Sequence, residues 1–306
     1  MSDASALRAG PSRVRFAVLR TLGRAVLTNR KAMAGACLLA LFIVMAAVPG
    51  LIAPGSPSAE LYRPGQGPSL AHLLGTTSYG QDIFTQFIWG ARVSLIIAVV
   101  AGLLSTALSA LVGVAAGYLP GAADGILSLI TDVFLVVPTF PLVIVLAAYS
   151  QAGGNAAIIA VLVVTGWAYG ARQLRAQVLS LRNRDFLVAA KLNGERPLRV
   201  IVFEILPNMT SLLVANFLGA SVYAILTAAG LQFIGLGNVN IDSWGTMLYW
   251  AQNNEALQAG LPIWAVAPGL GIALLGGAFA LLNYAFDEIG NPALRSVRKS
   301  GGRTDP

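Results

Sequence analysis

Few residues in this 306-residue chain are of the types that bind metals or form catalytic groups. Cys37 is the only cysteine, which excludes an intramolecular disulfide, and His72 is the only histidine, which cannot build a metal site unaided. We therefore expect Cys37 to pack within an apolar helix and His72 to make an ordinary loop contact. The chain has no G-x-x-x-x-G-K-S/T phosphate-binding loop, so any ATP hydrolysis must take place on other subunits. The sequence predicts no catalytic residue, metal site or cofactor on this chain.

The composition indicates a membrane protein. Hydrophobic residues make up 56% of the chain and charged residues only 11%, against about 25% charged in an ordinary soluble domain. A single soluble core could not hide this much apolar surface, so part of it must face lipid.

The uncharged stretches predict six transmembrane helices. The first, at 32–52, would be about 31 Å long, which matches the hydrocarbon core of a bilayer. The others are expected at about 93–118, 127–149, 156–174, 209–229 and 263–286. A polar break at 150–155 separates the third span from the fourth, and Asn208 is expected to cap the fifth. This organisation leaves a basic N-terminal segment at 1–31, a six-helix membrane domain at 32–286 and a tail at 287–306.

The basic residues predict the orientation of these spans. All but two of the 20 Lys and Arg residues lie before the first span, between the fourth and fifth spans, or after the sixth; the exceptions are Arg63 and Arg92. The positive-inside rule therefore places both termini and the loop around 170–207 in the cytoplasm. The first apolar run is too long for a cleaved signal peptide, so it is expected to be retained as a helix.

The loop after the fourth predicted span carries its own start and stop signals. Asp185 can cap a short helix, and Asn193 with Gly194 can end it in the left-handed conformation. A second helix can begin at Pro197 and end where Pro207 leads into the fifth span. The first helix would expose the apolar residues Phe186, Leu187 and Leu192, while Ala189 and Ala190 would let another protein approach closely. Periodicity alone leaves open whether it is a docking element or an ordinary surface amphipathic helix.

Two segments on the opposite side, at 54–92 and 230–262, are long enough to form docking surfaces. The second is rich in aromatic residues: Phe233, Trp244, Tyr249 and Trp250. Such residues most simply anchor a protein in the headgroup region.

Several motifs together resemble one family. Ala189, Ala190, Gly194, Leu206 and Pro207 are similar to the cytoplasmic EAA signature of the permease subunits of binding-protein-dependent ABC importers. Further segments resemble the second permease of dipeptide and oligopeptide importers, and they occur in the same order along the chain. They are 29–32 (NRKA), 72–76 (HLLGT), 80–82 (GQD), 90–95 (GARVSL), 117–118 (GY) with Asp132, Val133 and Pro138, 172–182 (RQLRAQVLSLR), 230–237 (GLQFIGLG), 243–248 (SWGTML) and 268–270 (PGL). Val188, Gln81 and Ala228 depart from the family's usual residues.

The resemblance implies an all-α integral membrane protein of the bacterial plasma membrane. It would have six transmembrane helices, both termini in the cytoplasm and, as in type I ABC importers, a short cytoplasmic coupling helix. The implied partners are a homologous second permease subunit, two cytoplasmic ATPase subunits that hold ATP and Mg²⁺, an extracytoplasmic substrate-binding protein and membrane lipid, with no nucleic acid. The implied coupling residues are Asp185, Phe186, Leu187, Val188, Ala189, Ala190, Lys191, Leu192, Gly194, Leu206 and Pro207.

The pathway for a peptide would need polar groups within the spans. The only carboxylate in the predicted spans is Asp132, which is either a structural helix-end group or a pore-lining one. Asn216, Ser221, Tyr223 and Thr227 on the fifth span are further candidates, although such residues commonly form interhelical hydrogen bonds. Three other interpretations remain open: an importer of nickel or another small solute, an ATP-independent channel or carrier, and a membrane-embedded enzyme. The enzyme is disfavoured because no catalytic constellation is visible.

Overall fold

The computed structural model describes residues 29–149 and 154–290, and every regular element in that part of the chain is a helix. The elements are α2 (Arg30–Ala47), α3 (Pro49–Ile52), α4 (Ile83–Tyr118), α5 (Ala122–Val136), α6 (Thr139–Tyr149), α7 (Gly154–Leu181), α8 (Asp185–Leu192), α9 (Pro197–Val200), a π-helical segment (Ile201–Ile205), α10 (Leu206–Asn208), α11 (Thr210–Phe233), α12 (Trp244–Asn253) and α13 (Pro262–Gly290). The all-helical prediction is confirmed for this part of the chain. Most of the basic N-terminal segment, part of the expected break at 150–155 and most of the tail lie outside the described residues.

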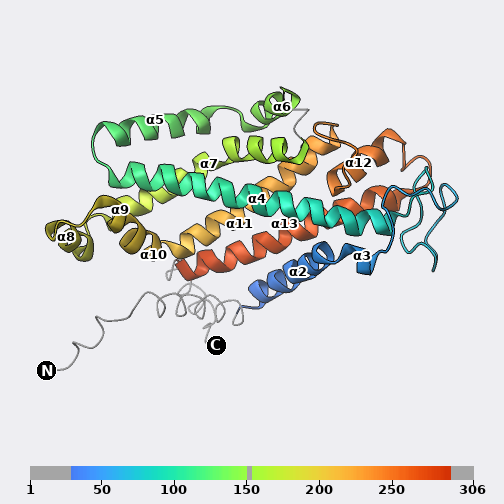
Figure 1. Ribbon diagram of the computed structural model, residues 1–306, viewed down its shortest axis with the longest axis horizontal. Coiled ribbons are helices and arrows are strands. Elements are labelled where there is room, and N and C mark those ends of the chain that lie inside the picture. The colour runs from blue at the N-terminus through green and yellow to red at the C-terminus, as the bar shows by residue number, and fades with distance from the viewer. Residues whose placement is uncertain (1–28, 150–153, 291–306) are drawn as a thin grey trace, which may run out of the picture.

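The long helices form an elongated bundle in which α4 has a central place (Figure 1). It packs against α7, α11 and α2, while α13 packs against α11 and α2. Helix α5 lies across the outside of α4 and α7. Five helices of the described residues are long and apolar enough to cross a membrane, and the bent pair of α5 and α6 can supply a sixth span.

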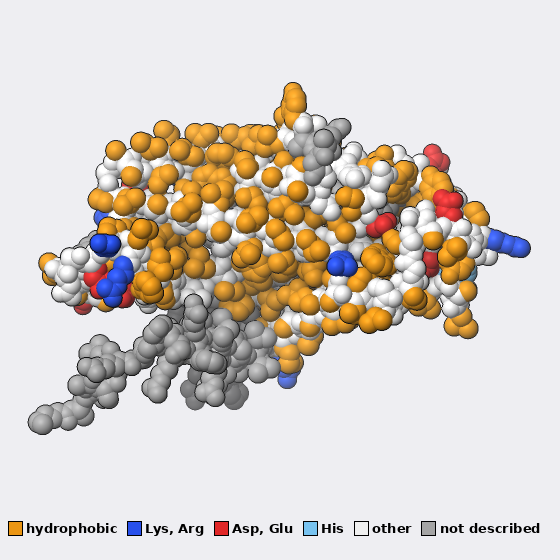
Figure 2. Space-filling view, viewed as in Figure 1, with side chains coloured by type: hydrophobic (Ala, Val, Ile, Leu, Met, Phe, Trp, Pro, Cys, Tyr) orange, Lys and Arg blue, Asp and Glu red, His pale blue; other side chains and the backbone are white. Residues whose placement is uncertain are grey.

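The surface shown in Figure 2 matches a membrane-spanning bundle. Apolar side chains cover the middle of this face, and charged side chains gather mainly towards its two ends. One end carries α8 and α9, and the other carries α12 together with the segment at 53–82. We call these the α8 end and the α12 end.

Several of the expected spans have different limits in the structure; the fourth, for example, continues to Leu181 in α7 rather than ending near residue 174. The first is not continuous over 32–52, because α2 stops at Ala47 and Pro49 begins the separate helix α3. The third is bent by 90° at Pro138, between α5 and α6. The second begins at Ile83 rather than near residue 93, because the Asp82 carboxylate caps α4 by accepting the Thr85 N–H at 2.9 Å.

The fifth span is not capped by Asn208 as expected. The Asn208 side-chain amide donates backwards to the Glu204 carbonyl oxygen at 2.6 Å, and α11 begins after Met209 without a side-chain cap. The sixth span continues through Pro268, which lies inside α13.

Small residues allow the long helices to approach each other closely. A methyl group in place of the Gly113 hydrogen would collide with the backbone of Ala171, where α4 meets α7. The same change at Gly102 would collide with Ser221, where α4 meets α11. Such contacts are typical of helices that pack within a membrane, where the apolar surroundings give no hydrophobic drive for association.

Candidate functional site

Helix α8 is a short element held at one end of the bundle. Arg184 occupies the cap position, because its carbonyl oxygen accepts the Val188 N–H at 3.1 Å. Asp185 is therefore not the cap but lies in the first turn, where its negative charge favours the helix dipole. At the other end the Glu195 N–H donates to the Ala190 carbonyl oxygen at 3.1 Å, and Gly194 has φ of 71°. The predicted left-handed stop at Gly194 is confirmed.

One face of α8 is buried against the bundle. Leu187 is fully buried and Ala190 is 9% exposed. Both belong to an apolar cluster that includes Leu174 and Val178 of α7 and Tyr118 of α4. The expectation that Leu187 is exposed and that Ala190 faces a partner is therefore wrong, because these two side chains fix α8 to its own chain.

The other face of α8 is uncovered and mostly apolar, with Asp185 as an exposed charged residue in its first turn. Phe186 is 39% exposed, Val188 43% and Leu192 83%, and Ala189 is also exposed. The Lys191 side chain lies outside the described part of the chain. Exposed apolar side chains gathered on a single short helix at the end of the bundle mark a surface that another protein can cover.

The return segment leads from α8 to α11 through a distorted helix. Pro207 has no N–H and its ring crowds the carbonyl of the preceding turn, so it disfavours the regular α-helical hydrogen-bond pattern at this point. The chain forms a π-helical turn at Ile201–Ile205 instead, in which the Leu206 N–H bonds to the Ile201 carbonyl oxygen. Leu206 packs against the same apolar cluster as α8, and Pro207 is exposed.

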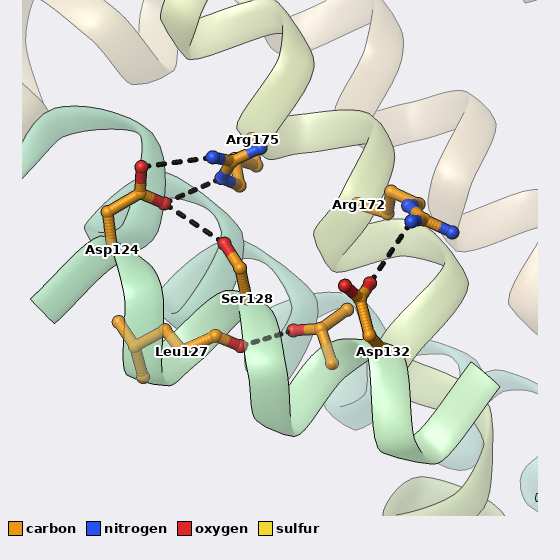
Figure 3. A network of polar contacts seen from close by, with 7 residues as sticks. Asp124, Leu127, Ser128, Asp132, Arg172 and Arg175 are labelled. Atoms are coloured by element: carbon orange, nitrogen blue, oxygen red, sulfur yellow. Dashed lines mark hydrogen bonds and ion pairs between the residues drawn. The ribbon is translucent and has the colours of Figure 1, made fainter. Parts of the chain in front are cut away.

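Two ion pairs connect α5 to α7 near the α8 end (Figure 3). The Arg175 guanidinium donates to both Asp124 carboxylate oxygens, with Nε 2.7 Å from Oδ1 and Nη2 2.9 Å from Oδ2. Ser128 donates to Asp124 at 3.0 Å, and Arg172 lies 3.1 Å from Asp132. Asp132 is thus a half-exposed partner of Arg172, so the structure gives it a definite structural contact.

A cavity of about 420 Å³ lies between α5, α6, α7, α11 and α13. Asn216 and Tyr223 of α11 line it, as do Gln173 of α7 and Asn283 of α13. The Tyr223 hydroxyl lies 3.1 Å from Thr165 Oγ1. None of the described residues that line the cavity carries a charge.

Two of the four α11 candidates lie outside this cavity. Ser221 is fully buried against Gly102 of α4 and donates to the Phe217 carbonyl oxygen at 2.9 Å, so it packs helices together. Thr227 is half-buried and is not among the lining residues. Asn283 and Gln173, which do line it, were missed. An isolated amide in the apolar stretch 263–286 was the available signal for Asn283.

The α12 end is built around Trp244, which is fully buried. The expectation that Trp244 anchors the protein in the headgroup region is therefore wrong. Its backbone N–H donates to Ser94 Oγ at 3.1 Å and its indole Nε1–H to the Phe87 carbonyl oxygen at 3.0 Å. A cleft of about 540 Å³ beside it is lined by Glu60, Asp242 and aromatic side chains, and burial raises the pKa of Asp242.

His72 makes the expected loop contacts, to Ser69 and to Gln66. Cys37 was expected to pack within a helix, but its side chain is exposed on α2.

The sequence comparisons bear directly on this architecture. Residues 109–296 match the model of the family described as "Binding-protein-dependent transport system inner membrane component". The chain belongs to this family. It is therefore a multi-pass permease component of the bacterial plasma membrane, and the matched region includes α8 and all five helices around the cavity.

Three curated relatives of this permease match it over two thirds or more of both chains. The oligopeptide transport system permease protein OppC of Mycobacterium tuberculosis (strain H37Rv) is 32% identical over 288 residues, which cover 93% of this chain and 98% of the relative. The dipeptide transport system permease protein DppC of Alkalihalophilus pseudofirmus is 33% identical over 275 residues, 88% of each chain. DppC of Bacillus subtilis is 34% identical over 221 residues, 72% of this chain and 69% of the relative.

Proposed function

We propose that this permease forms half of the membrane pathway of an ATP-driven importer of di- and oligopeptides. The observation that carries the proposal is the two-sided construction of α8. Leu187 and Ala190 fix one face to α4 and α7, while Phe186, Val188 and Leu192 leave the other face mostly apolar and uncovered. An element anchored in this way can pass a movement from a docked partner to the long helices.

In this proposal the α8 end lies in the cytoplasm, as the distribution of basic residues predicts. A cytoplasmic ATPase subunit covers the exposed face of α8, and a second ATPase subunit does the same for a homologous second permease. ATP and Mg²⁺ bind to the ATPase subunits. The substrate-binding protein delivers the peptide to the α12 end. The names of the relatives support a peptide as the transported solute.

The docking surface can be tested with a pair of matched substitutions. Leu192→Asp adds a charge to the exposed face of α8, and Leu198→Asp adds the same charge to α9 at a side chain that is 76% exposed. We expect Leu192→Asp to weaken co-purification of the ATPase subunits and to abolish peptide-stimulated ATP hydrolysis in proteoliposomes. Leu198→Asp should retain both. Full stimulation in Leu192→Asp would show that α8 is not the coupling element.

The class of transport can be tested with the same preparation. Proteoliposomes that hold the complete complex should take up a labelled tripeptide only with the binding protein and ATP present. Uptake that continues without the ATPase subunits would instead indicate a channel or an ion-coupled carrier. Uptake of Ni²⁺ but of no peptide would indicate a metal importer.

A further inference from the structure

The cavity between α5, α7, α11 and α13 contains two buried polar atoms that have no hydrogen-bond partner. One is Nδ2 of Asn216, a donor, and the other is Oδ1 of Asn283, an acceptor. Both residues line the cavity. A buried amide group without a partner costs about 1 to 3 kcal/mol, and few such groups occur in a folded chain unless a ligand or another molecule completes them.

The two amides lie on neighbouring helices at the same part of the cavity. A methyl group on Gly219 of α11 would lie 3.6 Å from Nδ2 of Asn283, so the α13 side chain rests against α11 at Gly219. Asn216 is one turn away on the same face of α11, since residues three apart share a helix face. The wall of the cavity therefore contains one unpartnered donor on α11 and one unpartnered acceptor on α13.

Glycine makes room for this arrangement. A methyl group on Gly170 of α7 would overlap the side chain of Asn216, and one on Gly166 would lie 3.0 Å from the ring of Tyr223. Both glycines line the cavity. Any larger residue at Gly170 would push the Asn216 amide out of its present position.

This side of the bundle is unsuited to lipid. Beside the cavity lies the ion pair of Asp132 and Arg172 (Figure 3), whose side chains are 52% and 63% exposed. Tyr169 of α7 is 68% exposed. Ionised groups of a membrane protein face a water-filled path or another protein rather than hydrocarbon. The cavity thus opens on a side where a polar solute can reach it.

We propose that Asn216 and Asn283 form a subsite that binds a backbone amide of the transported peptide. Asn216 Nδ2 donates to a peptide carbonyl oxygen, and Asn283 Oδ1 accepts a peptide N–H. Because the described lining residues carry no charge, the subsite recognises the neutral backbone and not the charged ends of the peptide. Every peptide offers the same pair of groups, so the subsite accepts different side chains. This assignment rests on the function proposed above.

The test uses a tripeptide and analogues in which one backbone amide is replaced by an ester. The ester keeps the shape of the peptide and its carbonyl oxygen but has no N–H. In proteoliposomes with the complete importer, we expect one ester analogue to raise the KM of uptake about fivefold, the effect of one lost hydrogen bond. The affinity of the binding protein for each analogue, measured separately, removes its contribution from this ratio.

The variants identify the acceptor. Asn283→Leu, or the smaller Asn283→Ala where leucine prevents assembly, should transport amide and ester analogues with equal KM. Asn216→Leu should raise both KM values together and keep their ratio, because the ester retains the carbonyl oxygen. Ser221→Ala is the control, since Ser221 is a buried polar residue of α11 outside the cavity, and it should keep the wild-type ratio.

Two results would overturn the subsite. In one, Asn283→Leu and Asn283→Ala keep the wild-type discrimination between amide and ester. In the other, they weaken association of the two permease subunits without changing that discrimination, which would mean that Asn283 binds the second subunit. Failure of the importer to transport any peptide is a different outcome, because it refutes the proposed function itself.

Discussion

Arg175 of α7 and Asp124 of α5 form a forked ion pair, with two N–H···O contacts of 2.7 and 2.9 Å. This pair and the Arg172–Asp132 pair lie along one side of α5, two turns apart, because Asp124, Ser128 and Asp132 recur at every fourth residue. Near the other end of α5, Phe134 packs against the buried Trp167 of α7, with ring centroids 5.2 Å apart. The two ion pairs and this aromatic contact together hold α5 in position on α7.

Replacement of Asp124 should loosen α5. Asp124→Asn removes the charge that pairs with the partly buried Arg175, at a cost of about 1 to 3 kcal/mol. Asp132→Asn is the matched control, because the Arg172–Asp132 pair is more exposed and should contribute about 0 to 1 kcal/mol. Thermal melting of the purified complex in detergent measures the difference. Equal melting temperatures for the two variants would contradict this ranking.

Trp244 should be the most sensitive aromatic residue at the α12 end. Trp244→Ala removes a fully buried indole that contacts Phe42 and Phe87, and should cost about 3 to 5 kcal/mol. Trp250→Ala, at a half-buried indole of the same helix, should cost less. The yield of folded, monodisperse protein on size exclusion chromatography measures the effect. A larger loss for Trp250→Ala would mean that the packing around Trp244 is not the core of this end.

Asp242 should make the stability of the α12 end depend on pH. Burial raises the pKa of Asp242 above its unfolded value, so the folded chain favours the neutral acid and is destabilised by the charged form. Asp242→Asn should therefore raise the melting temperature at neutral pH, and this gain should vanish below the unfolded value of about 3.9. Glu60→Gln, at an exposed residue of the same cleft, should change little. A gain from Asp242→Asn that is independent of pH would refute the explanation.

The elements of the α8 end could be predicted because their signals are local. Gly194 and Pro197 determine where α8 stops and where α9 starts, and both act within a few residues. The buried face of α8 could not be predicted in the same way, because Phe186, Leu187 and Val188 are all apolar. Leu187 is the one that is buried, through contacts with α7 and with α4, and α4 is far away in the sequence.

The polar groups within the spans show the same limit. Counting uncharged runs located the spans but set the start of α4 too late, because Arg92 interrupts the run while the Asp82 cap lies earlier. Asn216 was a candidate from its position in an apolar span, and its neighbours in the cavity come from other helices. The packing of α11 against α4 decides which polar residues of α11 face the cavity. Ser221 does not face it, because its side chain packs against Gly102 of α4. Periodicity within one helix does not contain that information.

The orientation of the chain predicts the reactivity of two engineered cysteines. Ser180 lies at the α8 end and Leu70, which is 99% exposed, lies at the α12 end. In a Cys37→Ala background, which removes the exposed native thiol, Leu70→Cys should react with a membrane-impermeant maleimide added to intact cells. Ser180→Cys should react only after the membrane is opened. The reverse pattern would invert the topology and place α8 out of reach of any cytoplasmic ATPase.

Gly194 gives the sharpest test of the local geometry of α8. Its φ of 71° lies in the left-handed region, which a β-branched side chain enters only at a cost of about 1 to 2 kcal/mol or more. Gly194→Val should therefore displace the end of α8, whereas Gly194→Asn should be tolerated because asparagine adopts this conformation. No heavy atom lies within 4 Å of the position that a side chain would take, so the two variants differ in backbone strain and not in steric overlap.

Both Gly194 variants should insert normally, because the residue lies outside the membrane-spanning helices. Gly194→Val should lose peptide-stimulated ATP hydrolysis in the reconstituted complex, and Gly194→Asn should retain most of it. The direct comparison is informative because Ala190, another small residue of the motif, is buried. Ala190→Glu would disrupt the apolar cluster itself, so its failure could not separate folding from docking. Full stimulation in Gly194→Val would show that the position of α8 does not control the ATPase.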